Sequence, residues 1–219
     1  MLWMRKLGWD AYGIDVAESY LRRGRAALAA EGYDEGCLRS ITNGHYPFDS
    51  SYFDVVLSDQ VIEHVFDVRS MVMETRRVSQ TGCVGLHIFP PRLRVVEPHM
   101  GTPFVHWIPP GAQRDRALRL CLRLGLAQRY FTDYSLDERV RIFAEFSESD
   151  VCYHRLSDIR YEFTSHDHSV HTVEPTAQNL ANRFPKLPRH LRAPLAHITQ
   201  HFSCVYMLTE ALEHGSARP

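Results

Sequence analysis

The amino-acid sequence predicts an α/β fold in which helices cover a mostly parallel β-sheet. Short apolar runs that suit buried strands alternate with segments whose apolar residues recur at helical spacing. Strand, helix and strand follow one another at 11–43 and again at 53–89, and this alternation is typical of parallel sheets. Polar residues follow the strand at 53–57, and open α/β sheets bind ligands at the carboxyl ends of their strands. We therefore expect one domain over residues 1–219 with a site at that edge.

The central unit runs from His45 to Pro91. Phe53–Leu57 is a short apolar strand that follows turn-forming residues. A helix is expected to start at Asp67 as N-cap and to end at Gly82, with Cys83–Phe89 as the next strand. Its buried face is predicted from helical spacing to comprise Val68, Met71, Val72, Thr75 and Val78.

The upstream segment repeats this order. Residues 1–8 suit the end of a helix that stops at Gly8. Ala11–Val16 is predicted as a strand that places Asp15 at its end, and a helix over 17–32 and a strand at Gly36–Asn43 follow.

Downstream of the central unit we expect an insertion over about 92–150 that forms a lid. It combines an irregular segment at 92–110 with helices at Arg114–Leu126 and Asp137–Glu148, the second opened by Ser135 as cap with Glu138 three residues later. A helix at Ser157–Phe163 and strands at 169–173 and 202–208 come next. Short helical pieces are expected in the proline-rich stretch 175–201, and a frayed tail at 215–219.

Composition excludes several classes of protein. A formal net charge of -1, with 44% hydrophobic and 23% charged residues, gives no reason to expect a nucleic acid or a membrane as partner. The five cysteines are scattered and form no C-x-x-C, which favours buried thiols in a reducing cytoplasm over disulfides or zinc. No signal peptide and no apolar run of membrane-spanning length is present, so a cytoplasmic location is expected.

A set of short motifs carries a resemblance to a known family. They are Gly13-Ile14-Asp15, Tyr46-Pro47-Phe48, Phe53-Asp54-Val55-Val56, Val61-Ile62-Glu63-His64-Val65, Asp67, Arg77-Val78 and Gly82. In combination they resemble the class I S-adenosylmethionine-dependent methyltransferases of the type 11 kind. The resemblance implies a Rossmann-like sheet, S-adenosylmethionine as cofactor and methyl transfer to a small-molecule acceptor.

The cofactor-binding residues implied by the resemblance are Asp15, Ile14, Thr42, Asn43, Ser58 and Gln60. A carboxylate at position 15 can accept hydrogen bonds from both ribose hydroxyls, although it could instead only cap the helix that follows. Thr42 and Asn43 match the adenine edge, where the family commonly has an Asp, so Asn43 departs from the pattern. Ser58 and Gln60 match the site of the methionine portion.

His64 is the candidate catalytic residue. Its ordinary pKa near neutrality suits a base that removes a proton from the acceptor. The alternative is a scaffold or cofactor-side role, because Glu63-His64 recurs in the resembling family whatever the acceptor is. The candidate substrate-binding residues in the segment after the last central strand are Arg92, His99, His106 and Trp107. A loop that packs only on its own side chains is the alternative for them.

The histidine-rich stretch 166–171 (HDHSVH) suggests a metal site at first sight. No cysteine or carboxylate partner stands at a convincing spacing, so a turn followed by an edge strand is expected and no metal.

The glycine-rich loop that passes beneath the cofactor in the family has no counterpart upstream of Asp15. The resemblance therefore implies a sheet without its first strand. The flanking strands would then expose unpaired backbone groups, which could pair with each other or recruit a second chain. Loss of the loop's contacts is expected to impair cofactor binding.

Three functions compete at this stage. A methyltransferase needs little more than positioning of the acceptor, which agrees with the lack of an evident catalytic dyad. A non-catalytic scaffold of the same fold is the alternative. A nicotinamide dehydrogenase fits worst, because neither G-x-G-x-x-G nor Tyr-x-x-x-Lys occurs.

Overall fold

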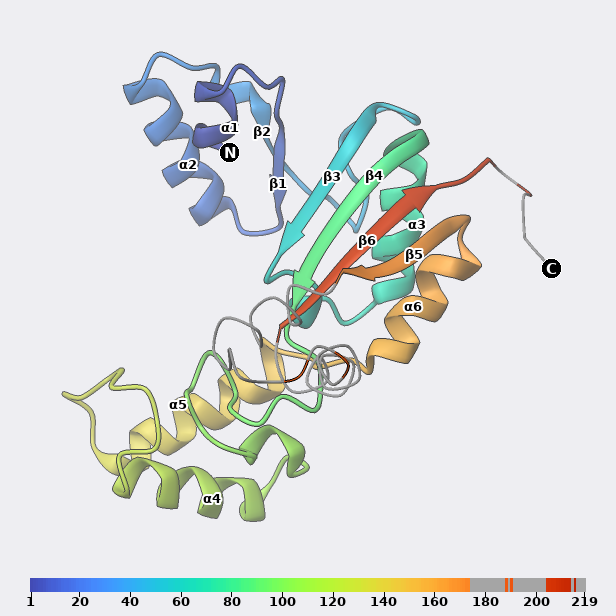
Figure 1. Ribbon diagram of the computed structural model, residues 1–219. Coiled ribbons are helices and arrows are strands. Elements are labelled where there is room, and N and C mark those ends of the chain that lie inside the picture. The colour runs from blue at the N-terminus through green and yellow to red at the C-terminus, as the bar shows by residue number, and fades with distance from the viewer. Residues whose placement is uncertain (174–187, 189, 191–203, 214, 216–219) are drawn as a thin grey trace.

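The computed structural model describes residues 1–173, 188, 190, 204–213 and 215 (Figure 1). The helical pieces expected at 175–201 lie almost wholly outside the described residues, as does most of the expected tail at 215–219.

The described strands form two sheets. The larger has the order β3 (Phe53–Asp59), β4 (Ser79–Phe89), β6 (Val205–Ala211) and β5 (His168–Val173). β3 pairs with β4 in parallel, and β6 is antiparallel to both β4 and β5. The smaller sheet is the parallel pair β1 (Gly13–Asp15) and β2 (Leu38–Ser40). The α/β, Rossmann-like class is confirmed, but the expectation of one continuous sheet is wrong for these strands, because no backbone pairing joins β1 to β3.

The helices occupy the places that the pattern predicted. Their bounds are α1 Leu2–Lys6, α2 Glu18–Ala30, α3 Val68–Val78, α4 Ala112–Arg123, α5 Leu136–Ser149 and α6 Leu156–Ser165. Short 3-10 helices lie at Glu35–Cys37 (η1), Ile62–His64 (η2) and Val105–Trp107 (η3). Asp67 caps α3 by accepting a hydrogen bond from the Ser70 N–H at 3.0 Å, and Ser135 and Glu138 form the predicted capping box of α5.

The prediction that Gly82 ends the helix before β4 is wrong. α3 ends at Val78 and β4 begins at the next residue. The Ser79 hydroxyl donates to the Thr75 carbonyl at 2.7 Å, and the Tyr52 N–H donates to the Val78 carbonyl. These carbonyl groups at the end of α3 therefore have partners, although no loop separates the helix from the strand. Gly82 lies inside β4 with a φ of 81°, a conformation that glycine adopts at little cost.

The main core lies between one face of the larger sheet and the helices α3 and α6 (Figure 1). β4 alternates in burial, as a strand covered on one side must. Cys83, His87 and Phe89 are buried, whereas Val84 is 46% exposed on the opposite face. On that opposite face Val55 and Leu57 of β3 are exposed as well. A second core cluster joins α4 and α5 to Met100 and Val105 of the segment that precedes them.

The segment containing β1, β2 and α2 meets the larger sheet through aromatic rings. The Tyr12 ring lies 5.5 Å from Phe48 and 6.0 Å from Phe53, both edge to face. Figure 1 shows β1 and β3 running in the same direction, so that their carboxyl ends lie toward the same end of the molecule.

Candidate functional site

Asp15 ends β1 and makes the turn into α2. Its Oδ1 accepts a hydrogen bond from the Ala17 N–H at 2.8 Å. This bond forms a turn just before α2, whose N-cap Ala17 has no side-chain cap. A carboxylate has about four acceptor positions, so the bond leaves capacity for a further donor. Ile14, half-buried, precedes it in the strand.

Thr42 and Asn43 lie in a tight turn after β2. The Thr42 and His45 backbones exchange hydrogen bonds of 2.9 and 3.3 Å. Asn43 and Gly44 between them have φ values of 52° and 76°, the left-handed pair that an Asn-Gly turn favours. The turn leaves the Asn43 side chain exposed at the tip, where a ligand can reach it.

Ser58 and Gln60 take different directions at the end of β3. The Ser58 hydroxyl is 2.8 Å from His87 Nδ1, and His87 Nε2 is 3.2 Å from the Thr209 hydroxyl, so these groups form a polar line across three strands. Burial lowers the pKa of His87 to about 4, with a smaller contribution from His168. The hydroxyl of Ser58 is thus engaged within the sheet.

Gln60 follows the strand with a φ of 54°, and its N–H bonds the Ile88 carbonyl at 2.8 Å. Its amide nitrogen lies 3.8 Å from the Cys204 Sγ, and the Arg94 guanidinium lies 3.0 Å from the same sulfur. Arg94 was not predicted as a site residue. Its place after β4, beside the predicted Arg92, is the signal that could have suggested it.

His64 and His99 meet although they come from different loops. His64 belongs to η2 after β3, and its Nδ1 is 2.5 Å from the Asp150 carbonyl oxygen. The two imidazole centroids are 5.0 Å apart, edge to face. Predicted catalytic and substrate-binding residues thus converge here.

The buried Glu97 holds this region together through hydrogen bonds to three residues. It is fully buried and accepts hydrogen bonds from His99 Nδ1 at 2.9 Å, from the Tyr153 hydroxyl and from the Met100 N–H. Burial raises the pKa of Glu97, but these hydrogen bonds outweigh burial and lower it overall. The bond to Glu97 in turn raises the pKa of His99, whereas burial and the adjacent Glu97 raise that of Tyr153.

Glu63 points into the same region. It is 1% exposed, and neither of its carboxyl oxygens receives a hydrogen bond from another described residue. Burial raises the pKa of its carboxyl group, partly offset by the residue's own backbone N–H and, to a smaller extent, by nearby His64 and His99. No signal in the sequence indicates that Glu63 would meet His99, since the two loops come together only in the folded chain.

Arg92, His106 and Trp107 form a neighbouring group. The Trp107 indole N–H donates to the Arg92 carbonyl at 3.1 Å. The His106 ring lies 5.2 Å from Tyr153 and 6.0 Å from Trp107, and burial lowers its pKa. Tyr153 therefore links the predicted substrate-binding residues His99 and His106.

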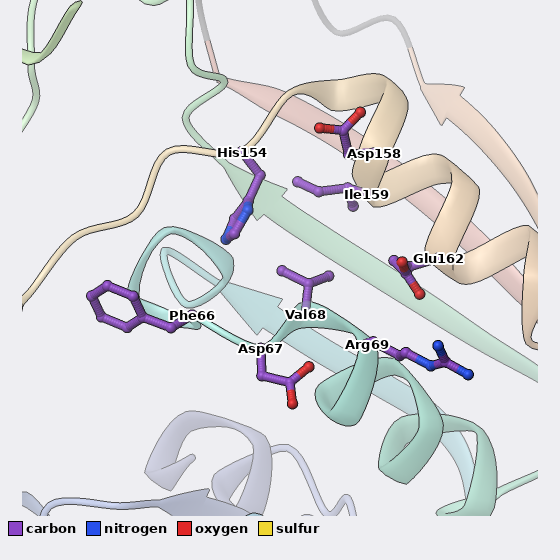
Figure 2. Close-up of a pocket in the computed structure, with 8 residues that line it drawn as sticks. All are labelled: Phe66, Asp67, Val68, Arg69, His154, Asp158, Ile159 and Glu162. Carbon is purple, nitrogen blue, oxygen red and sulfur yellow. The ribbon is translucent and has the colours of Figure 1, made fainter. Parts of the chain in front are cut away.

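A hollow of about 250 Å³ opens elsewhere, between the start of α3 and α6 (Figure 2). None of the predicted site residues lines it. Its lining residues are Phe66, Asp67, Val68, Arg69, His154, Asp158, Ile159 and Glu162. Two of its polar lining residues have structural roles, because His154 bonds the Val65 carbonyl and Asp67 caps α3.

Two imidazole rings of the histidine-rich stretch after α6 lie within hydrogen-bond distance of backbone carbonyl groups. His166 Nδ1 is 2.7 Å from the Glu162 carbonyl, and His168 Nδ1 is 2.9 Å from the His166 carbonyl. These contacts belong to the turn and edge strand that the sequence predicted.

Comparison with known proteins finds a methyltransferase family model that matches the first part of the chain. Residues 1–86 match a family model described as a methyltransferase domain, of the type 11 family. A comparison with curated protein sequences finds no match. Among the described residues, no helix is both long and apolar enough to span a bilayer.

Solved structures share the fold at low identity. One is an S-adenosylmethionine-dependent methyltransferase from Mesorhizobium loti, with 13% identity, a TM-score of 0.54 and coverage of 95% of this chain and 83% of that one. Another is the YcgJ protein from Bacillus subtilis, with 14% identity, a TM-score of 0.50 and coverage of 92% and 82%. The fold expected from the sequence is thereby confirmed. Residues 1–86 thus match the model of a methyltransferase domain, in a chain that shares its fold with a solved S-adenosylmethionine-dependent methyltransferase.

Proposed function

We propose that the protein transfers a methyl group from S-adenosylmethionine to a small-molecule acceptor. The observation that carries the proposal is the common orientation of β1 and β3, which both lie within the matched residues 1–86. Asp15 ends β1 and Gln60 directly follows β3, so both residues stand at the carboxyl ends of strands that run in the same direction. Ligands of α/β folds bind at the carboxyl ends of the strands, so these ends suit a nucleoside cofactor.

Asp15 would accept hydrogen bonds from the ribose hydroxyls, with Ile14 beside it. Thr42 and Asn43, in the exposed turn after β2, would border the adenine. Gln60 would hold the methionine portion, and Ser58 would support that position from within the strand through His87.

The acceptor would lie where the loops after β3 and β4 meet. His64 and His99 can exchange protons with it, and Arg92, His106 and Trp107 would border it, under a lid formed by residues of about 92–150. Holding the acceptor atom in line with the methyl group supplies most of the rate enhancement in such a reaction. The outer position of β3 in its sheet would also permit pairing with a second copy.

The experiment is calorimetric titration with S-adenosylhomocysteine on the wild type, Asp15→Ala and Asp34→Ala. The control is matched, because Asp15 and Asp34 each accept a hydrogen bond from the N–H two residues later, at 2.8 and 3.0 Å. Removing a charged hydrogen-bond acceptor from the ligand should weaken binding about tenfold or more. Asp34→Ala should bind as the wild type does. No binding by the wild type would overturn the proposal and favour a non-catalytic scaffold, and equal affinities of the two variants would remove Asp15 from the site.

A further inference from the structure

Glu63, His64 and His99 offer three metal-ligand types from two loops to one point. One donor atom from each lies within 4.8 Å of the other two, the described residues' only such group of three. Donor atoms about 2.1 Å from a tetrahedral ion stand about 3.4 Å apart, so small side-chain rotations suffice to close the site. We propose that these three residues bind a divalent transition-metal ion, with Zn²⁺ as the ion that the ligand set fits best.

The carboxyl group of Glu63 is the strongest argument. It is 1% exposed, and neither of its oxygens receives a hydrogen bond from another described residue. Buried polar groups nearly always have partners, and a buried carboxylate without one is costly. A bound cation would supply the partner that the described residues do not.

The two imidazoles are already oriented as metal ligands usually are. His64 Nδ1 bonds the Asp150 carbonyl at 2.5 Å, and His99 Nδ1 bonds the Glu97 carboxylate at 2.9 Å. Metal-bound histidines characteristically give their other ring nitrogen to a carbonyl or a carboxylate. Here that leaves the Nε2 atoms of both rings for the ion.

Outer contacts hold this arrangement in place. The Tyr153 hydroxyl donates to Glu97, and the Cys152 N–H bonds the Glu63 carbonyl at 2.6 Å. The segment between α5 and α6 therefore fixes both loops that carry the ligands. These contacts restrain the ligand residues in a way that histidines on an open surface are not restrained.

Two imidazoles and one carboxylate leave a coordination position open, as in catalytic rather than structural zinc sites. His64 is exposed, so the site can be reached from solvent. The ion would bind an oxygen atom of the acceptor there and lower the pKa of its hydroxyl, and His64 would then be a ligand and not a free base. This role, unlike metal binding itself, rests on the proposed methyl transfer.

The test is calorimetric titration of chelator-treated protein with Zn²⁺, with Co²⁺ absorption spectra to report tetrahedral coordination. The wild type should bind one Zn²⁺ per chain. Glu63→Gln, which keeps the shape of the side chain, and His64→Ala should each lower the affinity for Zn²⁺ at least about tenfold. Tyr153→Phe should also lower it, because it removes the hydroxyl that bonds Glu97, the partner of His99. His171→Ala, on an exposed histidine of β5, should bind as the wild type does.

Absence of stoichiometric binding by the wild type, or unchanged affinity in Glu63→Gln and His64→Ala, would refute the site. Circular dichroism spectra establish that the variants are folded. Titration of metal-free wild type with S-adenosylhomocysteine separates the two proposals, because cofactor binding there would stand even if the metal site failed.

Discussion

Acid should destabilise the protein through His87, and the amount can be worked out from its surroundings. The imidazole is fully buried between Ser58 and Thr209, with Phe163 4.7 Å away and His168 as the nearby titratable group. Burial lowers the pKa of His87 to about 4, below its ordinary 6.5. Between these two pH values the unfolded chain binds a proton that the folded chain does not. The free energy of unfolding therefore falls as the pH drops from 6.5 toward 4.

The magnitude follows from the two pKa values. Integrated from pH 7.5 to pH 5, the difference amounts to about 2 kcal/mol for this one group. In His87→Gln, which keeps hydrogen-bonding groups but does not titrate, that part of the acid loss should disappear. The wild type and the variant have all other titrating groups in common. The difference between their losses of unfolding free energy from pH 7.5 to pH 5 therefore reports on position 87.

The assay is urea unfolding of wild type and variant at pH 7.5 and pH 5, followed by circular dichroism. His171→Gln is the control, since it removes an exposed histidine from β5 of the same sheet and should keep the wild-type loss. An acid loss in His87→Gln as large as that of the wild type would refute the reasoning.

Three further changes test the packing by urea unfolding at neutral pH. Phe163→Ala should lower the free energy of unfolding by about 3–5 kcal/mol because the ring is fully buried, whereas Tyr161→Ala, 67% exposed on the same helix, should change it by less than about 0.5 kcal/mol. Arg77→Ala should lower the free energy of unfolding by about 1.5–3 kcal/mol, because the guanidinium bonds two main-chain carbonyls and a carboxylate. If the loss were no greater than that in Arg69→Ala, on the exposed face of the same helix, these bonds would not contribute to stability. Ser135→Ala should cost about 1 kcal/mol by removing the capping box of α5, and an unchanged stability would show that the cap adds nothing.

Local patterns were sufficient to predict most of the elements. The helical spacing from Val68 onward located α3, and the Ser135 cap located the start of α5. These features depend on neighbours within one turn of helix, which the sequence displays directly. Gly82 misled because glycine both ends helices and bends strands, and only the pairing of β4 decides between the two.

The candidate site was predictable only in part. Polar residues after a strand indicated the edge, and so Asp15 and Gln60 could be named. The meeting of Glu63 with His99, and the buried Glu97 beneath them, depends on how two loops and the segment at 150–154 pack together. No periodicity encodes such long-range contacts. For the same reason the sequence could not show that the Ser58 hydroxyl bonds His87 within the sheet.

The claim that Asp15 and Gln60 border one cofactor pocket is tested most directly by hydrogen–deuterium exchange with and without S-adenosylhomocysteine. The account predicts slower exchange in both the peptide spanning 13–18 and the peptide spanning 58–65 when the ligand is bound. The control is the peptide covering α6, which contains none of the proposed site residues. Slowing in only one of the two peptides, or in neither at saturating ligand, would contradict a shared pocket.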